Sequence, residues 1–328
     1  MKLHQDKEIF TEAILNTAEY LKIQEVFIEK DYWVTYVLKN LSQSKYKGTV
    51  VFKGGTSLSK AYRLINRFSE DIDLAIIQAQ GTSGNAIKNL IKDVEVEITN
   101  GLKEIEMPGT TSKGSKFRKT VFEYPKVIEG GDFGQAKDNL LLEINSFANP
   151  HPHNEMPIQS MIADFLMQTS RKDAVESYEL KSFNINVLGL ERTFTEKILS
   201  LVRASYGEKP MDELAARVRH IYDLHFILSK ASMRKFVSGT GFKKAISDVL
   251  ADDERNSQFQ GEWTKKPLPE SLFFFDWKNV WKNLLPVYES TFKKMVFSEL
   301  PNSKAIDESI GFIIKYINDG NVADLADK

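Results

Sequence analysis

Cysteine is absent from this chain of 328 residues. Its absence excludes disulfide bonds, zinc sites with cysteine ligands and thiol catalysis. A surplus of charge is missing as well, because 44 lysines and arginines stand against 45 aspartates and glutamates. No global charge therefore points to a nucleic acid or a membrane as partner, and any such partner must be bound by a local patch.

Long apolar runs are the third absence. The first segment, MKLHQDKEIFTEAILNTAEYLKI, mixes charges among its apolar residues and lacks the continuous apolar core of a signal peptide. Nor does any apolar run approach the roughly 18 residues that a membrane-spanning helix requires. We therefore expect no membrane insertion and a cytoplasmic location.

The residues that are present predict an ordinary globular protein of two domains. Hydrophobic residues make up 42% and charged residues 27% of the chain, a balance that allows a full core. Proline and polar residues are concentrated at 149–158, which predicts a loop and a domain junction. Helical patterns dominate from Phe194 onward. We expect an α+β fold, with a mixed sheet and flanking helices in residues 1–155 and a mainly α-helical domain in residues 156–328.

A strand, a turn and a helix are predicted in succession near residue 50. Residues 49–52 are apolar and mostly β-branched, which indicates a buried strand. The turn Lys53-Gly54-Gly55-Thr56-Ser57 follows, and a helical pattern continues toward Phe68. Two glycines let the backbone approach a phosphate, the helix start favours an anion, and the hydroxyls add donors. Alone, a Gly-Gly before a helix is more often only a turn, and this one lacks the ending of a P-loop.

The next predicted strand, Ile72 to Ile77, carries a pair of carboxylates at its start. Asp71 and Asp73 are two residues apart, so both project from one face of the strand. Such oxygens are the ligands that hard cations prefer, and together with a phosphate turn they predict Mg²⁺ or Mn²⁺ bound with a nucleoside triphosphate. An isolated Asp-x-Asp usually marks a solvated strand edge, but the spacing after the Gly-Gly turn favours the metal interpretation.

A third carboxylate, Glu143, lies in the apolar segment LLLEINSF. A glutamate beside a buried run of leucines is costly unless it is paired or bound to a metal, so it is a candidate member of the site. The alternative is a residue at the end of a strand that faces solvent by alternation. Both interpretations remain open from the sequence.

The densest positive run of the chain is SKGSKFRK, which contains Lys113, Lys116, Arg118 and Lys119. Such a run could hold the phosphate backbone of a nucleic acid. It could equally be the solvated edge of a hairpin formed by the predicted strands KFRKTVFEYPKVI and NLLLEINSF. The second interpretation is slightly favoured.

Residues 52–77, FKGGTSLSKAYRLINRFSEDIDLAII, resemble the signature of the nucleotidyltransferases of the DNA polymerase β-like superfamily. More narrowly they resemble the AbiEii/AbiGii-type toxins, relatives of the MenT-like toxins. Three further segments match the family pattern in order: EKDYW at 29–33, EKI at 196–198 and RHIYDL at 219–224. The resemblance spans about residues 25–230, and the last hundred residues carry no matching motif.

This resemblance implies a Mg²⁺-dependent enzyme that moves a nucleoside monophosphate from an NTP to an acceptor hydroxyl. The toxin relatives imply RNA as acceptor, especially the tRNA 3′ end, and a type IV-like toxin–antitoxin or abortive-infection system with a cognate antitoxin. The wider superfamily also permits nucleotidylation of a protein or a small molecule. A non-catalytic nucleotide-binding module is a further alternative, against which the intact Asp71 and Asp73 argue.

The resemblance also assigns roles to residues in the matching positions. The nucleotide-binding residues come from the turn, the following helix and the pattern Arg-x-Ser-x-Asp-x-Asp, and they are Lys53, Gly54, Gly55, Thr56, Ser57, Lys60 and Ser69. Asp71 and Asp73 would ligate the metal, with Glu143 as the candidate third carboxylate. Lys197 and Asp223 would come from the helical half and close over the nucleotide in a cleft between the domains.

Lys197, Asp223 and the matching segment at 29–31 also have simple structural interpretations. Lys197 lies on a helix rich in charge, where a solvated lysine is ordinary, and Asp223 follows Arg219 by four residues, which suits a salt bridge on one helix face. The run EKD at 29–31 could begin a surface network of salt bridges. As a family feature it would instead support the floor of the active site.

Overall fold

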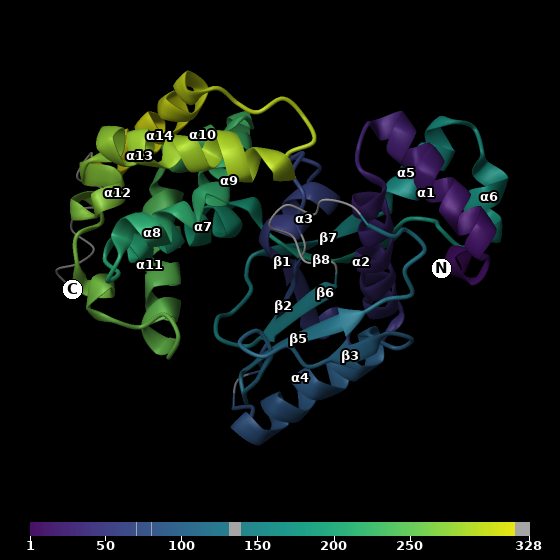
Figure 1. Ribbon diagram of the computed structural model, residues 1–328. Coiled ribbons are helices and arrows are strands. Elements are labelled where there is room, and N and C mark those ends of the chain that lie inside the picture. The colour runs from purple at the N-terminus through teal and green to yellow at the C-terminus, as the bar shows by residue number, and fades with distance from the viewer. Residues whose placement is uncertain (70, 80, 131–138, 319–328) are drawn as a thin grey trace. The chain divides into compact units, whose positions relative to one another are not determined.

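A computed structural model of the chain (Figure 1) describes residues 1–69, 71–79, 81–130 and 139–318. The chain folds into two compact units, Met1–Leu188 and Gly189–Lys328. The first unit combines a sheet with helices, and the described part of the second unit is built from helices. The predicted α+β class, with a mainly helical second part, is therefore confirmed.

The boundary between the units lies later than the junction predicted at residues 155 and 156. The proline-rich segment forms strand β7 (His153–Ile158), which pairs antiparallel with β8 (Phe183–Leu188). Because β7 is an edge strand of the sheet, the missing N–H of Pro157 is tolerated there. This pairing ties the residues after the loop to the first unit, which moves the division to Leu188.

The first unit is organised around a mixed sheet. Its strand order is β3-β5-β6-β2-β1-β8-β7, with β4 paired to β5. β1 is parallel to β8 and β2 is parallel to β6, whereas the remaining pairs are antiparallel. The strands not yet given are β1 (Val50–Lys53), β2 (Asp71–Ile76), β3 (Lys103–Ile105), β4 (Ser112–Lys113), β5 (Phe117–Glu123) and β6 (Leu140–Asn145).

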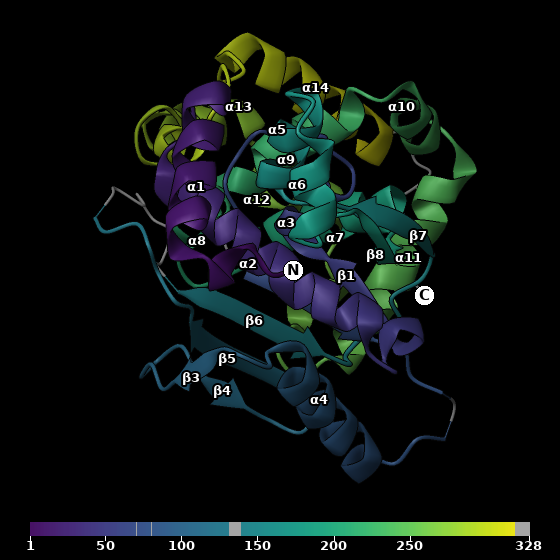
Figure 2. The ribbon, with the colours of Figure 1, turned by 90° about the vertical axis from the view of Figure 1, so that its right-hand side faces the viewer.

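One face of this sheet is covered by the apolar core. Ile72 and Leu74 of β2 and Leu142 of β6 lie fully buried in that core, together with residues of α1, α2 and α4. Figure 2 shows these three helices and the strands of the sheet. Since successive side chains of a strand point to opposite faces, Asp71 and Asp73 project from the other face. The helices of the first unit are α1 (Lys7–Leu21), α2 (Glu25–Gln43), α3 (Gly54–Lys60), α4 (Gly84–Ile98), α5 (Met161–Gln168) and α6 (Lys172–Ser177).

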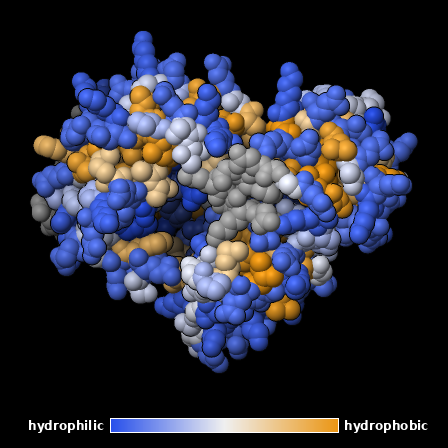
Figure 3. All heavy atoms as spheres, in the orientation of Figure 1, coloured by the Kyte–Doolittle hydropathy of each residue, from blue (hydrophilic) through white to orange (hydrophobic). Residues whose placement is uncertain are grey.

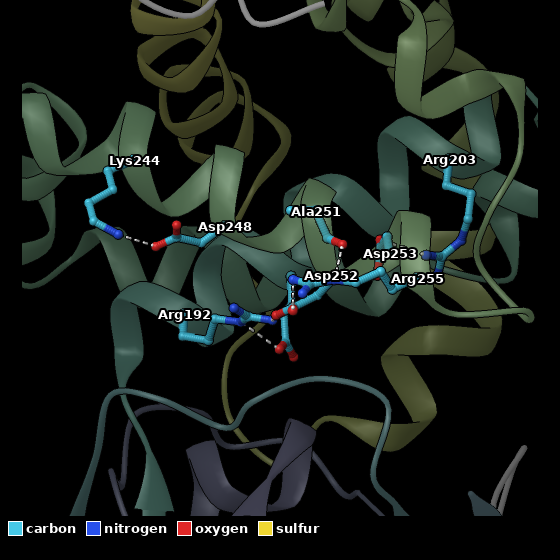
Figure 4. Close-up of polar contacts among 9 residues, drawn as sticks. Arg192, Arg203, Lys244, Asp248, Ala251, Asp252, Asp253 and Arg255 are labelled. Carbon is cyan, nitrogen blue, oxygen red and sulfur yellow. Dashed lines mark hydrogen bonds and ion pairs between the residues drawn. The ribbon is translucent and has the colours of Figure 1, made fainter. Parts of the chain in front are cut away.

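The helices of the second unit are α7 (Leu190–Ser205), α8 (Pro210–Ala215), α9 (Val218–Leu228), α10 (Ala231–Val237), α11 (Thr240–Arg255), α12 (Leu272–Phe275), α13 (Trp277–Val287) and α14 (Ser303–Asn318). Two arginines of α7 reach adjacent carboxylates of α11 (Figure 4). Arg192 lies 2.7 Å from Asp252, and Arg203 lies 3.2 Å from Asp253. These ion pairs fix how α11 packs along α7.

The surface agrees with the composition. On the face drawn in Figure 3, hydrophilic side chains predominate and hydrophobic ones form separate patches. None of the helices in the described ranges has the length and the apolar character that crossing a membrane would demand.

Candidate active site

The turn between β1 and α3 is shaped around one carboxylate. Gly54 has φ of +78°, a conformation that glycine adopts without strain and that L-residues rarely adopt. β1 is antiparallel to β2, and this pairing places Lys53 opposite Asp73. A Cβ atom at Gly54 would overlap the carboxyl group of Asp73. Both the backbone angle and the close approach therefore require glycine at this position.

For the nucleotidyl transfer that the resemblance implies, we expect Gly54→Ala to lower the rate by about a hundredfold, because displacing Asp73 by even an ångström misplaces a carboxylate of the candidate site. The positive φ adds a cost of about 1–2 kcal/mol to folding. Gly109 is the matched control, since its φ is +75° and a Cβ there would meet nothing within 4 Å. Gly109→Ala should lose only the stability that the positive φ costs, measured by thermal unfolding, and keep its transfer rate. Equal rates for the two variants would contradict the close approach.

The second glycine of the turn is enclosed by the segment before β2. A Cβ atom at Gly55 would lie 2.5 Å from Nη2 of Arg67 and 2.9 Å from Oγ of Ser69. Arg67 is buried, and its Nη1 donates to the carbonyl of Phe68 at 3.1 Å. The structure thus brings Ser69, predicted as a nucleotide-binding residue, to the turn. It also places Arg67 there, to which no role was assigned from the sequence.

Four charged residues form a row across the sheet. Lys53 lies opposite Asp73, Asp73 is the partner of Glu143 on β6, and Glu143 lies opposite Lys119 on β5. Directly paired residues of neighbouring strands project from the same face. The row therefore reads Lys, Asp, Glu, Lys, and Asp71 adds a second carboxylate on β2. The pairing of β2 and β6 places Glu143 beside Asp73. This position is the one that a third carboxylate of the predicted metal site requires.

The outer end of this row is an ion pair. Nζ of Lys119 lies 2.5 Å from Oε1 of Glu143, with the two side chains 30% and 22% exposed. Burial alone would lower the pKa of Lys119, but the hydrogen bond and the charge of Glu143, with further contributions from Asp71 and Asp73, raise that pKa above its ordinary value. Lys119 was noted only as part of a basic run, because its partner depends on strand pairing.

The basic run is largely neutralised by neighbouring carboxylates. Lys113 lies 2.5 Å from Glu104, and Nε of Arg118 donates to Glu95 at 2.6 Å. With Lys119 also paired, three of the four basic side chains have an acidic partner. The run therefore offers less charge to a phosphate backbone than its sequence suggests, because β4 and β5 bring these residues to acids on β3, β6 and α4.

The hydroxyl groups of the turn are used within the protein. Oγ1 of Thr56 donates to the carbonyl of Asp71 at 2.5 Å, and Oγ of Ser57 donates to the carbonyl of Gly54 at 2.8 Å. Both side chains are buried. The Thr56 bond links α3 to β2, and the Ser57 bond lies within α3. In this arrangement the backbone of the turn, rather than its hydroxyls, is available to approach a phosphate.

Lys60 ends α3, which is shorter than the predicted helix. Its Nζ lies 2.5 Å from Oδ1 of Asp31, and the side chains are only 5% and 8% exposed. Oδ2 of Asp31 accepts from the N–H of Met161 at 2.8 Å. A buried ammonium needs such a partner. The phosphate contact predicted for Lys60 therefore competes with a buried ion pair that links α3 to α2.

The acidic and basic residues of the segment 29–31 are all buried, so the surface network considered for them is wrong. Glu29 accepts from the N–H of Val127 at 2.7 Å and from that of Ile128 at 3.3 Å. Burial raises the pKa of Glu29, and these backbone hydrogen bonds act against the rise. The segment thus stabilises the interior of the first unit, which agrees with the supporting role that the resemblance implied.

Lys197 on α7 and Asp223 on α9 form an ion pair inside the second unit. Nζ of Lys197 lies 2.7 Å from Oδ2 of Asp223, and the side chains are 7% and 0% exposed. The interpretation of Lys197 as a solvated surface residue is therefore wrong. The two residues that the family pattern singles out in this unit are direct partners, although 26 positions separate them in the sequence.

The carboxylates of β2 suit a cation that arrives with its substrate. Within the described ranges, no three His, Cys, Asp or Glu side chains are grouped so that they alone could hold a metal ion. Mg²⁺ usually keeps several waters and is bound by one or two carboxylates together with substrate phosphates. Asp71 and Asp73 provide such a pair beside a glycine turn. These residues fit magnesium brought by a nucleotide, not a cage made by the protein alone.

A family model described as the nucleotidyl transferase AbiEii toxin of a type IV toxin–antitoxin system matches residues 36–307. The chain belongs to this family. It is therefore a nucleotidyltransferase of the toxin type, a role that implies an NTP substrate and a cognate antitoxin. The resemblance drawn from the sequence is confirmed, and the match extends it well beyond residue 230.

Among solved structures, this AbiEii-family chain is similar to MenT4, a nucleotidyltransferase toxin from Mycobacterium tuberculosis. The TM-score is 0.48 at 15% sequence identity, over 92% of this chain and 98% of that one. A search among curated proteins gives no match.

Proposed function

We propose that this AbiEii-family protein transfers a nucleoside monophosphate from a magnesium-bound NTP to a hydroxyl group of RNA. The observation that carries the proposal is the placement of Asp73, which lies against Gly54 of the turn and has Asp71 on the same face of β2. Carboxylates and a glycine turn in contact are the parts needed to hold a metal and a triphosphate together.

The reaction requires the acceptor oxygen to attack the α-phosphorus, while the bond from that phosphorus to the bridging oxygen breaks. Pyrophosphate leaves, and the hydroxyl proton is released. Bound magnesium would neutralise charge on the phosphate oxygens. Asp71 and Asp73 would hold that ion, and the backbone at Gly54 and Gly55 would approach the phosphates. Ser69 lies at this turn and would orient the nucleotide.

The remaining predicted residues have narrower roles in this proposal. Lys53 is next to Asp73 and would contact the triphosphate, whereas the buried Lys60 would act by fixing α3 through Asp31. Thr56 and Ser57 would bind the phosphates through their backbone N–H groups, while their hydroxyls hold that backbone in place. Lys197 and Asp223 would act in the reaction as a preformed pair.

The acceptor is the part of the proposal that rests most on the family. We propose RNA as the acceptor, and within it the tRNA 3′ end, because the resemblance to the toxin family implies this acceptor. The alternative acceptor is a protein or a small molecule. Because three of the four side chains of the basic run have an acidic partner, we propose that the acceptor is bound elsewhere on the protein. The proposed location of the reaction is the cytoplasm, where NTP, RNA and the antitoxin meet.

Incubation with each of the four α-labelled NTPs and total tRNA tests donor and acceptor together. We expect label on RNA with one preferred NTP, no label when EDTA is present during the incubation, and no label with the Asp71→Asn/Asp73→Asn variant. Periodate oxidation of the tRNA 3′ end should prevent the labelling. Label on a polypeptide and none on RNA would rule out the RNA acceptor in favour of protein nucleotidylation.

A further inference from the structure

The charges of the four residues in the row cancel, and Asp71 lies beside the row. Lys53 and Lys119 carry two positive charges, and Asp73 and Glu143 carry two negative ones, so Asp71 provides the excess negative charge of the cluster. A strand face built only to bind divalent cations would not place an ammonium within 2.5 Å of one of its carboxylates. The pairing of Lys119 with Glu143 therefore needs an explanation that the transfer reaction alone does not give.

Geometry shows what Lys119 does to the row. Glu143 is the direct neighbour of Asp73 in the parallel pair of β2 and β6, and the antiparallel pair of β6 and β5 places Lys119 on its other side. Glu143 is therefore held between a carboxylate that repels it and an ammonium that attracts it. Its Oε1 is bonded to the ammonium, on the side away from Asp73.

We propose that Lys119 is a positioning residue that holds Glu143 away from the metal and keeps the affinity of the row for a free divalent cation low. This inference rests on the proposed function, because it takes Asp71 and Asp73 as the metal ligands. Two carboxylates bind a hydrated cation weakly, and the phosphates of an NTP supply the missing oxygens. The metal then binds together with the nucleotide instead of before it.

Binding of Mn²⁺ in the absence of nucleotide, followed by electron paramagnetic resonance, tests this role without using activity. In Lys119→Met, Glu143 is released and a positive charge is lost, so we expect Mn²⁺ to bind about tenfold more tightly than to the wild type. Lys119→Arg keeps the charge and should restore weak binding. Addition of Glu143→Gln to Lys119→Met should remove most of the gain.

Lys113→Met is the matched control, because Lys113 belongs to the same hairpin and lies 2.5 Å from Glu104 in a similar ion pair. It should leave Mn²⁺ binding unchanged. Both lysine side chains are partly exposed, and thermal unfolding shows that each variant is folded. A Lys119→Met protein that binds Mn²⁺ no better than wild type, or not measurably at millimolar Mn²⁺, would overturn the inference.

Failure of the inference and failure of the proposed function give different results. Asp71→Asn/Asp73→Asn in the Lys119→Met background should abolish Mn²⁺ binding. If binding persists there, the metal does not depend on these aspartates, and the proposed function is wrong. If binding depends on the aspartates but is the same with and without Lys119, the metal site stands and only the role of Lys119 is rejected.

Discussion

Asp71→Asn and Asp73→Asn are each expected to reduce nucleotidyl transfer by about a thousandfold, at the upper end of what a single electrostatic group contributes to catalysis. Asparagine has nearly the same shape as aspartate but carries no charge, so it cannot neutralise a cation or order it against the phosphates. Asp73 should be the more sensitive of the two, because it lies against Gly54 and is paired in register with both Lys53 and Glu143. The measurement is kcat/KM with a fixed acceptor over a range of NTP and Mg²⁺ concentrations.

Asp248→Asn is the control for this pair of variants. Asp248 lies on α11, where it pairs with Lys244 at 2.6 Å on the surface (Figure 4). Its loss should change neither the transfer rate nor thermal unfolding. If Asp71→Asn or Asp73→Asn kept more than about a tenth of the wild-type rate, the loss would lie well below the expected thousandfold and below even the roughly hundredfold lower limit for a group of this kind. The assignment of the metal to β2 would then be wrong.

Lys197→Met is expected to lower the free energy of unfolding by about 3–5 kcal/mol, because it leaves the carboxylate of Asp223 buried without its lysine. The side chains are 7% and 0% exposed, so water cannot replace the missing partner. Urea denaturation followed by circular dichroism measures the change. Lys244→Met, which breaks an exposed pair, should alter stability little.

The double variant Lys197→Met/Asp223→Leu separates stability from catalysis. Replacing both members of a buried ion pair by apolar residues of similar volume is often neutral for stability. We therefore expect the double variant to regain most of the stability that Lys197→Met loses. A transfer rate that stays low in this stable protein would assign the pair to the chemistry. A rate that returns to the wild-type level would make the pair purely structural.

Local patterns predicted much of the fold. Apolar segments located β2 and β6, helical spacing indicated the helices that follow Phe194, and the spacing of two positions from Asp71 to Asp73 sufficed to put both carboxylates on one face. The domain boundary was placed too early, because proline usually marks a loop. Pro157 instead occupies an edge strand, and the pairing of β7 with β8 cannot be read from composition.

The sequence predicted the placement of the candidate residues where one strand or one turn decides the geometry, and it did not predict their contacts where distant segments meet. Lys60 and Asp31 form one buried pair although they are 29 positions apart. The sequence shows only that Lys60 is near the phosphate turn, and it therefore predicts a phosphate contact and misses Asp31. Lys119 was treated as surface charge, since only the register of β5 and β6 reveals Glu143 opposite it. Long-range pairing of this kind has no signal in the spacing of a single sequence.

The central claim is transfer of a nucleoside monophosphate at the carboxylates of β2, and the position of the label in the donor NTP tests it most directly. The NTP is supplied with label at either the α- or the γ-phosphate, to the wild type and to Asp73→Asn, with Mg²⁺ and RNA. We predict that the wild type puts α-label on the acceptor and γ-label in pyrophosphate, and that Asp73→Asn does neither. Label from the γ-phosphate on the acceptor, or equal α-label transfer by the two proteins, would contradict the claim.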